Sequence, residues 1–409
     1  MNTHFKFTEG GLSAVKGIKT AGVHAGIKKH KKDIAIIYSE KVAAAAGVFT
    51  LNKVKAAPLL ISEEHLDASG GFCRAVVVNS GNANACTGSV GLANARAMGL
   101  AVAEALELAE EEVLVSSTGV IGVQLPMDLM ISGIKKACEA LSAGSSADAA
   151  EAIMTTDTYP KEAAVETVID GKTVKIGGIA KGSGMIHPNM ATMLGFTVTD
   201  LATTPVMLKE VLKEVADETF NMISVDGDTS TNDMLVILAN GEAGNRKITE
   251  KDANYYAFKE ALHALCRKLS ELIVRDGEGA TKFVTVKVIN APTVEDARKA
   301  ARSITTSALV KTAIFGEDAN WGRVIAAVGN SGAHFDPERI DMYMESAGGK
   351  EQMMQQGMGL AFSEETAKKI LSEKDIIFVV DLQLGSAAAT AWTCDFSYDY
   401  VKINADYRS

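Results

Sequence analysis

The sequence predicts an α/β fold. Short runs rich in β-branched residues alternate with longer segments rich in Ala, Leu, Met and Glu, and they do so in both halves of the chain. No Pro/Ser-rich linker separates two domains, and no fixed-period repeat stands out. With 409 residues, 47% hydrophobic and 22% charged, the chain can bury a large core as one unit or as two domains.

The first half alternates predicted strands with predicted helices. The strands are expected over 33–38, 74–79, 112–116 and 193–198. The helices are expected over 91–110, 127–141 and 147–154. In the first of these helices, Ala, Leu, Met and Glu dominate and apolar residues recur three and four positions apart, which is the period of a helix with one buried face.

The second half continues the same alternation. Its predicted helices are 205–220, 253–271 and 294–305, and its predicted strands are 234–239, 283–290, 376–382 and 395–403. Apolar and polar residues alternate along 283–289, which predicts a strand with one face in solvent. Because 395–403 is predicted to be a strand, we expect the C-terminal tail to be held in place, although tails are usually frayed.

Composition excludes several classes of protein. The formal net charge of −10 argues against nucleic acid as a partner, because phosphate binding needs a basic surface. No apolar run approaches the roughly 20 residues that span a bilayer, and residues 1–19 contain no apolar signal segment. The five cysteines are dispersed, without a CxxC pair or a zinc-type cluster, so we expect reduced thiols, a cytoplasmic location and no metal site.

The most informative segment is 181–196, which is rich in small residues and lacks any helical or strand period. In it, Thr192 follows Ala191 and precedes an apolar run. Its hydroxyl could attack the Ala191–Thr192 peptide, and hydrolysis of the resulting ester would leave Thr192 as a new N-terminus. The α-amine of such a residue, with an ordinary pKa of about 7.7–8.0, can accept the hydroxyl proton near neutral pH. From the residues alone, the alternative is a Gly-rich loop that leads into a buried strand.

Two further features suit acyl transfer. Thr118 and Gly119 follow an apolar strand, where a glycine lets the backbone approach a ligand and its N–H, with the Thr118 hydroxyl, can face a developing oxyanion. Lys181 precedes Thr192 by eleven residues, so its charge could lower the pKa of the new amine or pair with a substrate carboxylate. The alternatives are an ordinary turn and a solvated surface lysine.

Two other patterns are not assigned chemistry. His187 is the histidine nearest to the Thr192 segment, but the chain has no Gly-x-Ser-x-Gly elbow, so we predict a structural role for it. Residues 226–233 superficially resemble a calcium loop but lack its closing Glu. We predict a turn network that supports the nucleophile segment.

Residues 188–194, Pro-Asn-Met-Ala-Thr-Met-Leu, resemble the cleavage signature of the ornithine acetyltransferase family, the bifunctional glutamate N-acetyltransferase of arginine biosynthesis. Other segments resemble that family in the same order, namely 79–88, 117–122, 155–158, 224–233, 316–323 and the terminus 403–409. The resemblance therefore covers essentially the whole chain.

The resemblance implies an activity and an assembly. The activity is transfer of the acetyl group of N2-acetyl-L-ornithine to L-glutamate through an acetyl ester on Thr192, without a metal or organic cofactor. The resemblance does not decide whether acetyl-CoA serves as a second acetyl donor. Cleavage between Ala191 and Thr192 would give an alpha chain, 1–191, and a beta chain, 192–409. These fragments would fold together as a self-cleaving, N-terminal-nucleophile-like α/β/β/α arrangement and assemble as a heterotetramer of two alpha and two beta chains.

The resemblance also implies roles for individual residues. Thr118 and Gly119 would form the oxyanion hole, and Glu278 would bind the substrate amino group. The substrate contacts would be Thr155, Lys181, Thr192, Glu278, Asn404 and Ser409. Thr156 competes with Thr155 for its role, because the sequence does not exclude a shift of one residue.

Two alternatives belong to different classes. A self-cleaving amidohydrolase or aminopeptidase on a related scaffold would pass the acyl group to water and release acetate. A non-catalytic small-molecule binding protein would retain the fold and stay as one uncleaved chain.

Overall fold

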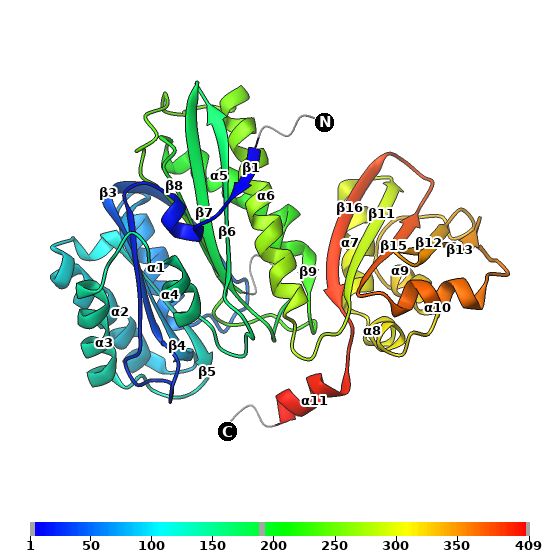
Figure 1. Cartoon of the computed structure of the whole chain (residues 1–409), viewed down its shortest axis with the longest axis horizontal. Helices are drawn as coiled ribbons and strands as arrows, with labels where there is room; N and C mark the ends of the chain where they lie inside the picture. The colour runs from blue at the N-terminus through cyan, green and yellow to red at the C-terminus, as the bar shows by residue number, and fades with distance from the viewer. Residues whose placement is uncertain (1–4, 188–192, 406–409) are drawn as a thin grey trace. The chain divides into compact units, whose positions relative to one another are not determined.

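The computed structural model describes residues 5–187 and 193–405, and it confirms a mixed α/β protein (Figure 1). The chain divides into two compact units. The first unit comprises Met1–Gly182, Asn189–Phe220 and Thr229–Ser270, and the second comprises Ser183–Pro188, Asn221–Asp228 and Glu271–Ser409. Within the described ranges, no helix is both long and apolar enough to cross a membrane.

The described strands of the first unit form one nine-stranded sheet in the order β1-β6-β7-β8-β10-β3-β4-β5, with β2 paired to β3. The strands are β1 (Phe5–Thr8), β2 (Ile18–Val23), β3 (Ile34–Phe49), β4 (Phe72–Asn82), β5 (Val113–Val120), β6 (Lys161–Ile169), β7 (Lys172–Lys181), β8 (Leu194–Thr199) and β10 (Met234–Ala239). Strands β7 and β8, which flank the undescribed residues 188–192, pair with each other, and Lys181 lies opposite Leu194.

This sheet folds over on itself at β3. Strands β5 and β7 are five positions apart in the sheet, or about 24 Å at the usual strand spacing. Nevertheless, Lys181 at the end of β7 contacts Thr118 of β5. The long β3 makes this possible, because its first part pairs with β2 and β4 and its last part pairs with β10, with a register shift between Tyr38 and Ala43. The two halves of the sheet thus face each other across a shared apolar core.

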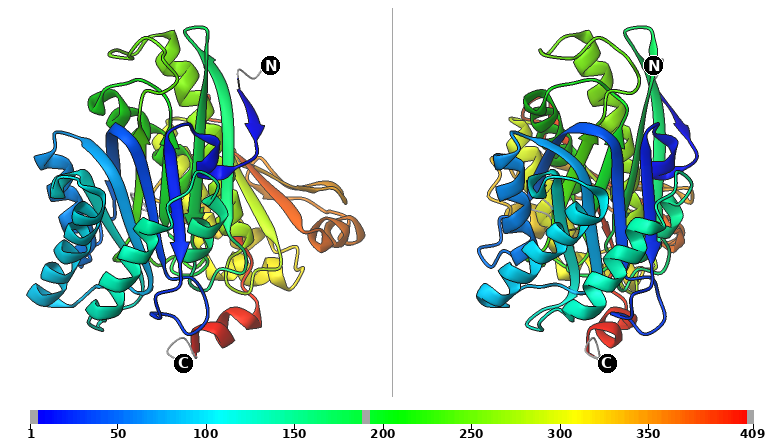
Figure 2. Two further views of the ribbon diagram at one scale, coloured as in Figure 1. Left: turned by 60° about the vertical axis from the view of Figure 1, so that its left-hand side comes forward. Right: turned by 90° about the vertical axis from the view of Figure 1, so that its left-hand side faces the viewer.

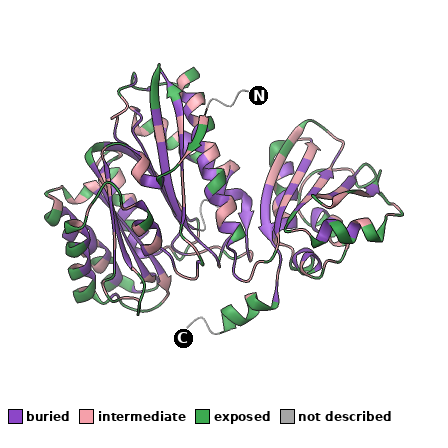
Figure 3. Ribbon diagram, in the orientation of Figure 1, coloured by how far each residue is buried: buried purple, intermediate pink, exposed green. Residues whose placement is uncertain are grey.

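Helices cover the outer faces of the first unit. Their bounds are α1 (Ala57–Ala68), α2 (Gly88–Leu106), α3 (Met127–Glu139), α4 (Ser146–Ala152), α5 (Pro205–Glu218) and α6 (Ala253–Arg275). A second apolar core joins α1, α2 and α3 to β2–β5. On the other half of the sheet, a side chain at Gly178 of β7 would meet Leu265 and Leu269 of α6, so that helix packs closely on β7. Burial is correspondingly continuous along the central strands (Figure 3).

The second unit holds the other described strands, in a seven-stranded sheet of order β14-β13-β12-β15-β11-β16-β9. The strands are β9 (Ile223–Ser224), β11 (Phe283–Ala291), β12 (Asp341–Ser346), β13 (Gly349–Gln355), β14 (Met358–Gly359), β15 (Asp375–Asp381) and β16 (Ala387–Cys394). The helices are α7 (Val294–Thr306), α8 (Ala308–Phe315), α9 (Trp321–Gly329), α10 (Glu364–Ser372) and α11 (Tyr398–Ala405). Burial alternates between buried and intermediate along most of β11, which confirms the predicted strand and its alternation, but no residue of β11 is exposed as the predicted solvent face requires.

The predicted strand over 395–403 is wrong. Strand β16 ends at Cys394, and the chain then forms the short helix α11. The Asp395 carboxylate accepts hydrogen bonds from the backbone N–H groups of Thr281 and Lys282, which holds the chain at the end of the sheet. Phe396 and Tyr400 then stack with ring centroids 4.9 Å apart, which is the i,i+4 contact of a helix. Because none of the residues of α11 is buried, the tail is also less tied down than predicted (Figure 3).

Two predicted boundaries also need correction. The strand predicted to end near 116 continues as β5 to Val120, so Thr118 and Gly119 belong to the strand itself. The helix predicted to reach residue 110 ends at Leu106, where Glu107 adopts the left-handed conformation at φ 54°. A left-handed residue at this position is a common helix stop.

Candidate active site

Thr118 and Gly119 lie at the end of β5, where its pairing with β4 becomes irregular. Gly119 has φ +131°, and a Cβ built on it would lie 2.3 Å from the carbonyl carbon of Gly81. A side chain is therefore excluded both by the backbone conformation and by the neighbouring strand. Glycine is thus required at the end of β5 by the close approach of β4, and the role of Gly119 in an oxyanion hole stays a prediction.

Asparagine side chains hold this end of β5 in place. Asn232, which precedes β10, donates hydrogen bonds from Nδ2 to the carbonyl oxygens of Ala83 at 2.6 Å and of Ser117 at 2.8 Å. The Ser117 hydroxyl donates to Asn79 Oδ1, and Asn79 Nδ2 donates to the carbonyl oxygen of Asn82. All of these side chains are buried, so the network orders the backbone on both sides of Thr118.

Lys181 reaches Thr118 from the opposite half of the sheet. Its side chain is buried, and Nζ lies 3.5 Å from Thr118 Oγ1, where an ammonium donates to the hydroxyl oxygen. Lys181 is also paired in register with Leu194. Thr192 and its cleavage partner Ala191 lie outside the described residues, but Thr192 is joined to Leu194 through a single residue. The structure thus brings Thr118, Gly119 and Lys181 together next to the strand that leads from Thr192.

Asp157 is a site residue that the sequence reasoning missed. Its Oδ1 accepts hydrogen bonds from Lys161 Nζ at 2.6 Å and from the Gly182 N–H at 2.8 Å, and its Oδ2 accepts one from the Thr155 N–H at 3.0 Å. Burial raises the pKa of Asp157, but the charges of Lys181 and Lys161 outweigh it and lower the pKa overall. Asp157 is therefore an anion that positions both the 155–156 turn and the end of β7. The choice between Thr155 and Thr156 as a substrate contact stays open.

A second buried carboxyl, Asp233, lies near the same cation. Burial raises its pKa well above the usual value, and the nearby Lys181 offsets only part of that rise. Its Oδ2 has no hydrogen-bond partner among the described residues. The next residue, Met234, donates from N–H to the carbonyl oxygen of Met193, so Asp233 lies beside the start of β8. The pKa values of the two buried carboxyls near Lys181 are thus shifted in opposite directions, and Asp157 is the one whose charged form is stabilised.

Glu278 and Asn404 contact each other within the second unit. Asn404 Nδ2 donates to Glu278 Oε2 at 2.7 Å, and the Glu278 N–H donates to the carbonyl oxygen of Ser183 at 3.0 Å. A Cβ on Gly184 would lie 2.3 to 2.5 Å from the Glu278 carboxylate, so only glycine leaves room for that group. The buried Glu278 is thereby fixed against the segment that leads towards Thr192. Ser409 lies outside the described residues.

The segment 185–187 is held by two other residues of the second unit. The Asp226 carboxylate accepts hydrogen bonds from the N–H groups of Met185 and Ile186, which confirms the turn network predicted for this region. His187 Nε2 lies 2.8 Å from a guanidinium nitrogen of Arg302. Burial and the Arg302 charge lower the pKa of His187 to about 4, so its ring is neutral near pH 7 and accepts this hydrogen bond.

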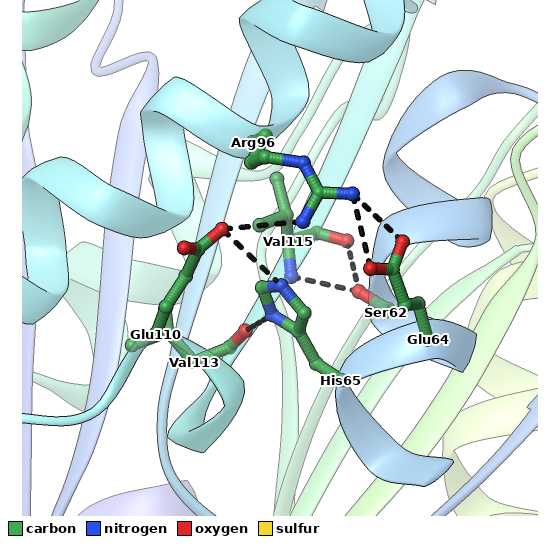
Figure 4. Close-up of polar contacts among 7 residues, drawn as sticks. All are labelled: Ser62, Glu64, His65, Arg96, Glu110, Val113 and Val115. Atoms are coloured by element: carbon green, nitrogen blue, oxygen red, sulfur yellow. Dashed lines mark hydrogen bonds and ion pairs between the residues drawn. The ribbon is translucent and has the colours of Figure 1, made fainter. Parts of the chain in front are cut away.

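Ser62 and His65 of α1 form a cluster with Glu110, just before β5, that resembles a hydrolase triad, but the serine and the histidine are held by backbone contacts (Figure 4). The Ser62 hydroxyl donates to the Val115 carbonyl at 2.7 Å and accepts from the Val115 N–H at 2.8 Å. His65 Nδ1 bonds the Val113 carbonyl at 2.7 Å, and its Nε2 lies 3.6 Å from Glu110. These side chains satisfy the outer edge of β5, which is the last strand of the sheet order. The cluster therefore supports the strand that carries Thr118.

Comparisons with known proteins show what this chain is similar to. The model of the ArgJ family matches residues 19–409. Proteins named "Arginine biosynthesis bifunctional protein ArgJ" from Symbiobacterium thermophilum and Thermotoga neapolitana are 55% and 54% identical over 98% and 96% of this chain and 99% of each relative. The solved ornithine acetyltransferase of Mycobacterium tuberculosis, complexed with ornithine, is 43% identical over 46% of this chain and all of that one, with a TM-score of 0.43.

Proposed function

This chain belongs to the ArgJ family, and from that premise we propose how it works as an ornithine acetyltransferase of arginine biosynthesis. The proposed reaction moves the acetyl group of N2-acetyl-L-ornithine to L-glutamate and releases L-ornithine and N-acetyl-L-glutamate. Thr192, freed by self-cleavage of the Ala191–Thr192 peptide, is the nucleophile. Acetyl-CoA is the second acetyl donor, which fits the word "bifunctional" in the names of the relatives.

The contact between Lys181 and Thr118 carries this proposal. Lys181 Nζ lies 3.5 Å from Thr118 Oγ1, and the backbone of Lys181 pairs with Leu194, two residues after the proposed nucleophile. Because the ammonium donates to the Thr118 oxygen, the Thr118 hydrogen is free to point at a substrate oxygen. The β7–β8 pair therefore brings the cation, next to the segment of the proposed nucleophile, against the oxyanion donor on β5.

The chemistry proceeds in two balanced steps. In the first, Thr192 Oγ attacks the acetyl carbonyl while its proton passes to the α-amine. The carbon–nitrogen bond then breaks, the leaving amine of ornithine takes that proton, and an acetyl ester remains on Thr192. In the second, the amine of glutamate attacks the ester, the carbon–oxygen bond breaks, and Thr192 Oγ regains a proton. In both steps the oxyanion receives hydrogen bonds from the Thr118 hydroxyl and the Gly119 N–H.

In this scheme the charged groups of the substrate pair with protein groups of opposite charge. Glu278, oriented by Asn404, binds the free ammonium of the substrate. Lys181 and the polar groups of Thr155 and Ser409 bind its carboxylate end. Acetylornithine presents its side-chain ammonium and glutamate its α-ammonium, which must lose a proton before it attacks the ester. Both substrates therefore depend on Glu278 when they bind. The route uses only groups of the protein, so it requires no metal or organic cofactor.

The proposed cleavage would leave two fragments that stay together. Strand β7 of the alpha fragment, 1–191, pairs with β8 of the beta fragment, 192–409, and β3 pairs with β10. These shared ladders support a self-cleaving α/β/β/α arrangement of the N-terminal-nucleophile type, and we place two copies of each fragment in a heterotetramer. The scattered free cysteines favour a cytoplasmic location.

Denaturing electrophoresis with N-terminal sequencing tests the proposal. The purified protein should give two fragments, and the second should begin with Thr192-Met193-Leu194. Thr192→Ala should remain a single chain, whereas the exposed control Thr173→Ala should be cut normally. Two fragments from Thr192→Ala would mean that another group or a contaminating protease makes the cut.

The fate of the acetyl group tests the second half of the proposal. With acetylornithine and glutamate, the product should be N-acetylglutamate, and double-reciprocal plots should be parallel because the acetyl-enzyme forms before glutamate binds. Acetate as the main product would indicate transfer to water. Converging plots would exclude the acetyl-threonine intermediate.

A further inference from the structure

The connection between β2 and β3, residues 24–32, forms a basic loop that takes no part in the proposed route. We propose that its exposed side chains Lys29, His30 and Lys31 bind the phosphate groups of acetyl-CoA, while the thioester end of that donor reaches the active site. The inference rests on the proposed function, in which acetyl-CoA is the second donor. Measuring both acetyl donors distinguishes a failure of this inference from a failure of the proposed function.

The basic loop is built around one buried carboxylate. Asp33, fully buried, accepts hydrogen bonds from the consecutive N–H groups of Ala25, Gly26, Ile27 and Lys28, at 2.6, 3.1, 2.7 and 3.0 Å. His24 Nε2 adds a contact to the Lys28 carbonyl. Four bonds to one carboxylate fix the backbone in a single shape. The backbone that leads to these cations is therefore fixed before any ligand binds, which lowers the entropic cost of binding.

The basic loop carries more positive charge than its neighbours balance. Residues 28–32 are Lys-Lys-His-Lys-Lys, in a chain whose net charge is −10. Lys32 pairs with Asp148 and Glu151, whereas no carboxylate of the described residues pairs with Lys29 or Lys31. The pKa of Lys28 is lowered to about 8, mainly by burial; the charge of Asp33 opposes this shift and the charge of Lys31 contributes to it. A bound anion would relieve this repulsion.

The basic loop borders the candidate active site. Lys28 Nζ donates to the carbonyl oxygen of Met154 at 3.0 Å, next to Thr155. A Cβ on Gly81 would lie 3.1 Å from Lys28 Cγ, and Gly81 is the register partner of Gly119. Lys28 thus spans from the end of β5 to the 155–156 turn. The start of β3 pairs with the end of β4, Ile34 with Asn79, so the loop that precedes β3 lies at this end of the sheet (Figure 2).

The chemistry of acetyl-CoA matches this placement. The donor carries its acetyl thioester at one end and its phosphates at the other, separated by an extended chain. When the thioester is at Thr192, the phosphates must lie at the rim of the site rather than inside it. Lysine ammonium groups at the rim are suitable hydrogen-bond donors to phosphate oxygens. Acetylornithine and glutamate have no phosphate, so they do not need the basic loop.

The test compares the two acetyl donors in one double variant. Lys29→Ala/Lys31→Ala should raise KM for acetyl-CoA on the order of 10-fold, the combined effect of two exposed charge contacts. KM for acetylornithine should not change. Lys29→Arg/Lys31→Arg should retain the wild-type KM for acetyl-CoA. The control Lys209→Ala/Lys213→Ala removes two exposed charges of α5 and should affect neither donor.

Calorimetric titration supplies a measurement that does not depend on turnover. CoA and adenosine 3′,5′-bisphosphate should bind wild-type protein and bind Lys29→Ala/Lys31→Ala about 10-fold more weakly. Equal loss for both donors, equal loss in the α5 control, or unchanged binding in the double variant would overturn the proposal. A wild-type protein that neither binds CoA nor uses acetyl-CoA would also overturn it, while acetylornithine-to-glutamate exchange would still stand. If that exchange failed instead, the titration would continue to decide the role of the basic loop.

Discussion

At the scale of single residues, the site depends on how charge is balanced around Lys181. Of the two buried carboxyls near this cation, Asp157 has a lowered pKa and Asp233 a raised one, because only Asp157 has a second lysine and two backbone N–H groups as partners. The ionised Asp157 with Lys161 and Lys181 leaves one positive charge unbalanced among these three groups, and that charge is available for a substrate carboxylate or for polarising Thr118. Sequence patterns predicted Lys181, Thr118 and Gly119, but a lone aspartate in a polar turn gives no local signal that it will be buried.

Thr118→Ala should lower kcat by roughly 10²–10³, the usual loss when one oxyanion donor is removed. KM and the melting temperature should change little, because the hydroxyl acts mainly in the transition state. Thr118→Ser, which keeps the hydroxyl, should retain most of the activity. An unchanged kcat in steady-state assays of Thr118→Ala would place the oxyanion hole on other donors.

Asp157→Asn should destabilise the protein by about 3–5 kcal/mol, because it leaves the fully buried Lys161 without its counter-charge. The effect should depend on pH. The folded pKa of Asp157 lies below the unfolded value of about 4, so its stabilisation is present above that value and is lost as the pH falls towards the folded pKa.

Urea unfolding at a series of pH values checks this prediction. The deficit of Asp157→Asn relative to wild type should shrink below about pH 4, as the wild-type carboxyl becomes protonated. The double variant Asp157→Asn/Lys161→Met removes the unpaired charge and should recover part of the stability. A deficit that stays constant from pH 7 to pH 3 would contradict an ionised Asp157.

At the scale of elements, the strands that position the site are mostly predictable, whereas their arrangement is not. Apolar runs correctly predicted β8 and β10, and the alternation of apolar and polar residues correctly predicted β11, with bounds within a residue or two. The β6–β7 hairpin was missed, although Asp170-Gly171 at its turn, with φ of 52° and 70°, is a strong hairpin signal. The fold-over at β3 has no local signature, because it depends on which distant strands pair with each part of that strand.

The edge of β5 offers a test of how one element is held. Ser62→Ala would leave the buried N–H and C=O of Val115 without partners, so we expect a loss of about 1–3 kcal/mol in the free energy of unfolding. Glu64→Gln, in the same cluster, breaks an exposed ion pair with Arg96 and should cost less than about 1 kcal/mol. Equal losses in the two variants, measured by denaturant unfolding, would mean that Ser62 does not support β5.

At the scale of the whole molecule, the chain order and the compact units do not coincide. Segments 183–188 and 221–228 belong to the second unit but interrupt the first, so the chain passes from one unit to the other several times. The residues that resemble the family's active site are correspondingly divided, with Thr118, Thr155 and Lys181 in the first unit and Glu278 and Asn404 in the second. A linear division at residue 191 describes the proposed covalent products rather than the folded units. No pattern within the sequence indicates such interleaving, because it arises from long-range contacts.

The C-terminal helix provides a prediction at this scale, because it separates folding from substrate binding. Helix α11 has no buried residue, so deleting residues 404–409 should leave the melting temperature within about one degree and should leave the proposed self-cleavage intact. The deletion nevertheless removes Asn404, which orients the Glu278 carboxylate through a 2.7 Å hydrogen bond. We therefore expect KM to rise for acetylornithine and for glutamate together, about tenfold for a lost contact of about 1.4 kcal/mol.

Glu278→Gln should raise the same two KM values, because it removes the charge that the substrate ammonium needs. Lys402→Ala, which breaks an exposed pair with Asp399 on the same helix, is the matched control and should change neither KM nor stability. Steady-state kinetics with each substrate varied in turn, together with thermal unfolding, would show whether these residues contribute to substrate binding or to stability. If the truncated protein kept both KM values while Glu278→Gln raised them, Glu278 would bind substrate without help from the tail. If both variants matched wild type, the ammonium site would lie elsewhere in the molecule.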